Sequence, residues 1–80
     1  MLNSNQSMPM RVLVQNGDTG LFLKSDKLWT SLAVEARDFG SSVNAIQQAL
    51  DMQLHHPAII LSFGDPKLDL KIPLGGARAF

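Results

Sequence analysis

The stretch Ser42-Val-Asn-Ala-Ile-Gln-Gln-Ala-Leu-Asp-Met-Gln-Leu54 decides the fold, because it has the clearest helical period in the chain. Its apolar residues recur at i, i+3, i+4 and i+7 and form one stripe: Val43, Ile46, Ala49, Leu50 and Gln53 or Leu54. Ser41 or Ser42 can cap the first turn, since a serine hydroxyl accepts hydrogen bonds from free N–H groups. Pro57 prevents continuation, so we predict a helix over about residues 42–54.

Extended segments precede this helix. Arg11-Val-Leu-Val-Gln15 and Leu21-Phe-Leu-Lys24 are joined by a polar loop that contains glycine, which predicts a hairpin. Leu28-Trp-Thr30 is an optional third strand. Residues 31–39 predict one short helical turn that ends in an extended Phe39.

Two further extended segments follow the helix. Residues 58–63 and 68–72 are joined by Gly64-Asp-Pro-Lys67, whose proline and aspartate favour a turn. Leu68, Leu70 and Ile72 alternate with polar residues, which is typical of a half-buried strand. The order β-β-(β)-α-β-β predicts an α+β domain, an antiparallel sheet of four or five strands with one helix packed on one face.

The 80 residues predict one domain over residues 10–74, with a flexible lead-in at 1–9 and a flexible tail at 75–80. Met10 is an alternative start. An apolar share of 45% and a charged share of 18% are typical of a globular chain. The absence of cysteine excludes disulfides and thiolate chemistry.

Seven basic and seven acidic residues cancel, which argues against a strong field for nucleic acid or anionic membrane. No apolar run approaches the ~20 residues of a membrane span, so we expect no membrane partner. The first nine residues do not resemble a signal peptide, and we expect a cytoplasmic location.

The sequence predicts no enzyme and no catalytic residue. Glu35 is expected on a surface turn, the turn aspartates serve conformation, and no Gly-x-Ser-x-Gly motif occurs. His55 and His56 are adjacent in a loop, where their side chains diverge, and the nearest acid along the chain is Asp51. We therefore expect no metal and no cofactor.

Strand parity gives the functional hypothesis, because one helix can cover only one face of a sheet. One parity class faces the helix: Val12, Val14, Leu21, Leu23, Ile59, Leu61, Phe63, Leu68, Leu70 and Ile72. The other parity places Leu13, Phe22 and Ile60 on an open face. We predict a protein-interaction module that uses this face or an uncovered strand edge, and a homodimer is one form that the interaction can take.

Trp29 is a further interaction candidate, although a tryptophan outside the main strands also commonly pins its segment to the core. The alternative function is weak binding of single-stranded nucleic acid. In that case Phe22 stacks on a base, while Arg11, Lys24 and Lys71 contact phosphates. A third alternative is that the open face is simply hydrated.

Residues 20–49 carry a pattern of aromatic hairpin, Trp-Thr step, Ala-x-x-Phe and serine-capped helix. The matching residues are Phe22, Trp29-Thr30, Ala36-Arg37-Asp38-Phe39, Ser41 or Ser42, and Ala45 or Ala49. This pattern resembles small bacterial and phage domains of uncharacterised function. The resemblance covers fewer than half of the residues and implies the order of the elements, without a function.

Overall fold

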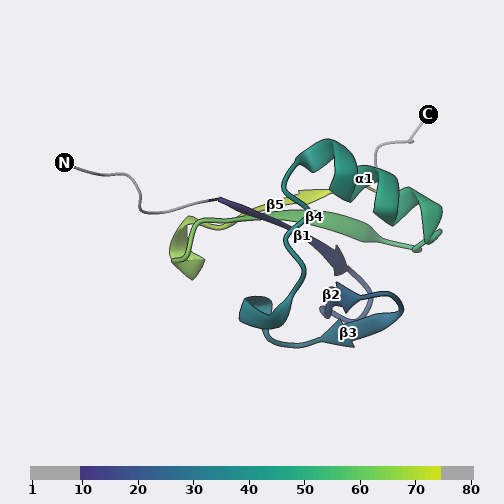
Figure 1. The fold of residues 1–80 in the computed structure, drawn as a ribbon, viewed down its shortest axis with the longest axis horizontal. Coiled ribbons are helices and arrows are strands. Elements are labelled where there is room, and N and C mark those ends of the chain that lie inside the picture. The colour runs from purple at the N-terminus through teal and green to yellow at the C-terminus, as the bar shows by residue number, and fades with distance from the viewer. Residues whose placement is uncertain (1–9, 75–80) are drawn as a thin grey trace.

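The structure is a computed structural model that describes residues 10–74, and these residues form an α+β fold (Figure 1). The predicted lead-in at 1–9 and tail at 75–80 lie outside the described residues. The predicted fold class and element order are confirmed. The elements are β1 (Arg11–Asn16), β2 (Phe22–Ser25), β3 (Leu28–Thr30), the 3₁₀ helix η2 (Ala33–Glu35), α1 (Ser42–Asp51), β4 (Pro57–Ser62), the 3₁₀ helix η3 (Pro66–Leu68) and β5 (Leu70–Pro73).

The five strands form one antiparallel sheet in the order β3-β2-β1-β4-β5. The optional third strand is therefore present and forms one edge, while β5 forms the other. β1 and β4 are the central pair, and their register places Val12 opposite Leu61 and Val14 opposite Ile59. The last predicted strand begins at Leu70 instead of Leu68, because residues 66–68 form η3.

Helix α1 begins at the cap provided by Ser41, whose Oγ accepts from the Asn44 N–H at 3.2 Å. The helix ends at Asp51, three residues earlier than predicted. Gln53 has a φ of 56°, a left-handed conformation that stops the helix before Pro57 can do so.

The buried face of α1 is centred on Ala45 and Ala49. Val43 and Leu50, which the apolar stripe placed in the core, are each 62% exposed. That part of the prediction is wrong. The small alanines allow the helix backbone to approach the sheet closely. Ile46 and Leu54 of the same stripe pack half-buried against the core, whereas Val43 and Leu50 are turned outward.

Helix α1 contacts β1 and β4, where the main core lies. The parity prediction is confirmed for the buried Val12, Val14, Leu23 and Ile59 and for the half-buried Leu61. Leu70 and Ile72 also lie on the helix side, opposite Leu61 and Ile59, but they are exposed, as is Leu68, so their predicted burial under the helix is wrong. A helix about 10 Å wide covers about two strands spaced roughly 4.8 Å apart, so β5 extends beyond its shelter.

The connection from β3 to α1 crosses the sheet between β1 and β2. These strands share one residue pair, Gln15 with Phe22, and then separate. In the gap, the Phe39 N–H donates to the Val12 carbonyl at 2.8 Å, and the Arg37 N–H donates to the Leu23 carbonyl at 2.9 Å.

The crossing moves the chain from one face of the sheet to the other. Ala36 packs against Leu13 and Ile60 on one face, whereas Phe39 packs against the α1 core on the opposite face. Figure 1 shows this connection running across β1 before it enters α1. Helix α1 thus lies on one face of the central strands, and the segment 33–36, which contains η2, lies on the other over Leu13 and Ile60.

Asp38 fixes the crossing and gives it a pH dependence. Its Oδ1 accepts from the Val12 N–H at 3.0 Å and the Gly40 N–H at 2.9 Å, and these bonds lower the Asp38 pKa below 3.8. Because the folded-state pKa is depressed, the stabilisation is complete above pH ~3.8 and is lost as the pH falls through the folded value.

We expect Asp38→Asn to lower the free energy of unfolding by about 1 kcal/mol at pH 6, and to approach the wild type at pH 3. Urea unfolding at both pH values measures this difference. Asp26→Asn, at an exposed aspartate of the β2–β3 turn, is the matched control and should follow the wild type. Equal losses for Asp38→Asn at the two pH values would contradict the assignment.

Candidate functional site

The face predicted to be open is covered by the chain itself. Leu13 is fully buried and Ile60 is 7% exposed, and both pack in a second core cluster with Ala36. Phe22 is half-buried against the same cluster, as is Ala33 of η2. The prediction that Leu13 and Ile60 line an available contact surface is therefore wrong, because the segment at 33–36 occupies that face.

Arg11 holds this cover in place. Its guanidinium donates to the Ala33 carbonyl at 3.0 Å and to the Ala36 carbonyl, the two acceptors at the start of η2 and just beyond its end. Lys24 lies 3.9 Å from Glu35 of η2. Two of the three cations that the nucleic-acid alternative assigns to phosphates therefore contact their own chain.

Trp29 is half-buried and packs against the α1-side core. It lies opposite Leu23 in the register of β2 with β3. Trp29 therefore attaches the edge strand β3 to the core.

The sheet has an apolar surface at its other edge, over α1 and β5. It consists of Val43 and Leu50, each 62% exposed, with Leu70 at 54% and Ile72 at 43%. Leu70 and Ile72 lie opposite Leu61 and Ile59 in the register, so they share the helix side of the sheet. We call these four residues the α1–β5 surface.

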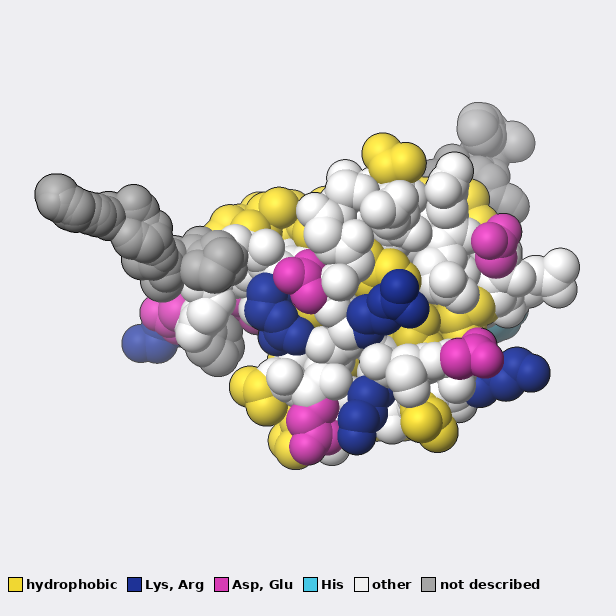
Figure 2. All heavy atoms as spheres, viewed as in Figure 1, with side chains coloured by type: hydrophobic (Ala, Val, Ile, Leu, Met, Phe, Trp, Pro, Cys, Tyr) yellow, Lys and Arg dark blue, Asp and Glu magenta, His cyan; other side chains and the backbone are white. Residues whose placement is uncertain are grey.

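The helical period shows which side of α1 faces β5. Gln48 and Asp51 line a half-open hollow of about 410 Å³ with Leu23 and Lys27 of the β2–β3 hairpin. At 100° per residue, Val43 and Leu50 lie on the other flank of the helix, which is the flank nearer β5, and they point largely to solvent. Figure 2 shows hydrophobic side chains exposed along the margin of the molecule where Figure 1 places β5.

Within residues 10–74, no strand pairs with the outer edge of β5. The Leu74 N–H donates to the Pro57 carbonyl at 2.9 Å. Because main-chain groups of successive residues in a strand point alternately to its two neighbours, this bond shows which residues of β5 face β4. The main-chain groups of Leu70 and Ile72 consequently point to β4, and those of Lys71 point outward. Pro73 also lies at an outward position, where its lack of an N–H costs no ladder hydrogen bond.

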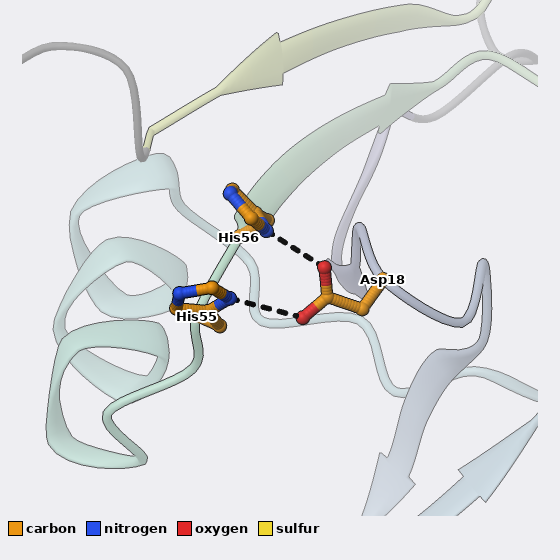
Figure 3. A group of neighbouring side chains, drawn as sticks. All are labelled: Asp18, His55 and His56. Atoms are coloured by element: carbon orange, nitrogen blue, oxygen red, sulfur yellow. Dashed lines mark hydrogen bonds and ion pairs between the residues drawn. The ribbon is translucent and has the colours of Figure 1, made fainter.

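A second candidate site joins the β1–β2 turn to the loop after α1. The His56 Nδ1 lies 2.7 Å from Asp18 Oδ1, and the His55 Nδ1 lies 3.6 Å from Asp18 Oδ2. Figure 3 shows both rings directed at the same carboxylate. The hydrogen bond from His56, with the charges of His56 and His55, lowers the pKa of Asp18 below 3.8.

Sequence reasoning missed this cluster because Asp18 and His56 are 38 residues apart. The expectation that the adjacent histidines diverge is also not met, since both Nδ1 atoms face Asp18. The register of β1 with β4 places Asn16 opposite Pro57 and so brings the two loops together. That register cannot be read from the residues of either loop.

Comparisons of the chain with protein-family models, curated proteins and solved structures returned no match. The resemblance to small bacterial and phage domains therefore stays a prediction. No helix within residues 10–74 has both the length and the apolar character needed to cross a bilayer.

We expect Arg11→Met to lower the free energy of unfolding by about 1–2 kcal/mol, because it removes two charged hydrogen bonds that hold η2 over the sheet. Urea unfolding measures this loss. Lys24→Met removes a half-exposed ion pair to the same segment and should cost below about 0.5 kcal/mol. A similar loss in both variants would show that the Arg11 bonds do not secure the cover.

Proposed function

We propose that this domain is a protein-interaction module that forms a homodimer through the α1–β5 surface and the outer edge of β5. The observation that carries this proposal is the exposure of Leu70 and Ile72, at 54% and 43%, on the edge strand β5. Apolar and polar residues alternate in β5 as they do in a strand with one buried face. A second copy of β5 paired with this edge would extend the sheet and place the partner's apolar side chains beside these residues on the same face.

A second copy of the chain is the occupant that fits this edge. A two-fold axis through Leu70 in an antiparallel pairing sets Lys71 of each copy opposite Asp69 of the other. Asp69 and Lys71 carry opposite charges, so this register is electrostatically complementary. An axis through Lys71 would instead place two lysines side by side.

The apolar contribution is moderate. Burying the exposed part of each α1–β5 side chain contributes about 1 kcal/mol. Association costs about 4–15 kcal/mol in lost translational and rotational freedom. We therefore expect a dimer that forms at high protein concentration and dissociates on dilution.

The role that we propose is binding and not catalysis, and the cytoplasm is the compartment that we propose for it. The nucleic-acid alternative has less support, because Arg11 and Lys24 contact η2 and Phe22 packs against Ala36 and its neighbours. We put forward no nucleic-acid role.

We expect Leu70→Asp to reduce the dimer fraction strongly in sedimentation-velocity measurements over a range of concentrations. The introduced carboxylates would face each other across the axis and would lose their hydration. Circular dichroism should show an unchanged fold, because Leu70 is mostly exposed. Lys71→Glu should also weaken the dimer, since it places Glu opposite Asp69.

Val34→Asp is the matched control, because Val34 is 82% exposed on η2, away from β5. The dimer should survive this substitution. A wild-type chain that stays monomeric at all concentrations would overturn the proposal. Dissociation by Val34→Asp but not by Leu70→Asp would place the interface on the η2 side and would also overturn it.

A further inference from the structure

We propose that Asp18, His55 and His56 form a binding site for a divalent transition-metal ion such as Zn²⁺. The site lies at the loops beyond the ends of β1 and α1 and is separate from the outer edge of β5. It can therefore exist whether or not the chain dimerises.

The ligand atoms are near coordinating distance. One ligand atom from each of the three side chains lies within 4.8 Å of the others. Ligand atoms around a tetrahedral zinc lie about 3.4 Å apart, because each is about 2.1 Å from the metal. The 2.7 Å contact between Asp18 and His56 would open slightly and His55 would move inward, and exposed side chains can make both changes by rotation.

The main chain holds the two loops together. The Gly17 N–H donates to the His56 carbonyl at 2.6 Å, and a Cβ on Gly17 would collide with that oxygen. The Asp18 N–H donates to Asn16 Oδ1 at 2.8 Å, so the turn is set without the Asp18 side chain. The hydrogen bonds of the Gly17 and Asp18 N–H groups therefore hold Asp18 next to both histidines, and they remain when the Asp18 side chain is replaced.

The donor set selects the class of ion. Two imidazole nitrogens and one carboxylate oxygen suit zinc, nickel and copper, whereas calcium and magnesium prefer all-oxygen sites. The side chains are 46–81% exposed, so water completes the coordination. A bound ion would link the β1–β2 turn to the loop after α1 and raise the melting temperature.

The test is isothermal titration calorimetry, in which the full, untagged chain is titrated with ZnCl₂ and, in a second experiment, with CaCl₂. We expect one zinc ion per chain and no measurable binding of calcium. Asp18→Asn, His55→Gln and His56→Gln should each weaken zinc binding by at least about tenfold, the loss typical of disturbing a metal site. Asp26→Asn, at an exposed aspartate in another turn, is the control and should bind like the wild type.

Circular dichroism should show that each variant is folded, and ¹⁵N spectra of the imidazoles should place the ion on the Nδ1 atoms of His55 and His56. Zinc should raise the melting temperature of the wild type and not that of Asp18→Asn. Zinc affinity that is unchanged in the three variants, or equal for zinc and calcium, would overturn the proposal. So would the absence of binding to the folded wild type.

Discussion

The passage of residues 37–39 between β1 and β2 is the constraint on which the other features of the fold depend. The Phe39 and Arg37 N–H groups bond to the carbonyls of Val12 and Leu23, which would accept hydrogen bonds between the two strands if the β1–β2 ladder were continuous. In return, this passage lets a short connection place η2 on one face and α1 on the other. Asp38 satisfies the Val12 N–H that the separated strands leave without a ladder partner.

This crossing explains why the central strands are covered on both faces while, among residues 10–74, neither layer extends over the edge strand β5. The four residues of the opposed pairs Leu13–Ile60 and Val14–Ile59 are all buried. Leu13 and Ile60 lie in the cluster with Ala36, and Val14 and Ile59 lie in the core under α1. β5 has neither layer above it, and all four of its residues are exposed. The surfaces left for binding are therefore at the sheet margin and in the loops, and the centre of the sheet is structural.

Periodicity predicted the element types, their order and the side of the sheet on which Val12 and Ile59 lie. It could not predict the lateral position of α1, because alternation shows which face a residue occupies and not whether anything covers it. Leu13 and Leu70 show the two resulting errors. Alternation puts Leu13 on the face away from α1, where the segment 33–36 covers it, and puts Leu70 on the helix side, where α1 does not reach it.

The candidate sites were predictable to different degrees. The strand edge was named from the sequence as a class of surface, but its residues were not. The Asp18–His55–His56 cluster depends on strand pairing between distant segments, and neither loop contains all its members. Pairing register is set by tertiary packing, so no local pattern of residues contains it.

The uneven covering of the sheet implies uneven local stability. Amide hydrogens of β1 and β4 are shielded by neighbours on both sides, so they should exchange with solvent only when the whole domain unfolds. β5 is bonded along one edge alone and can detach through a small local opening. A chain that pairs with β5 would thus rigidify the least protected strand. The amide hydrogens of β5 would then exchange more slowly, so their exchange rates would report on association.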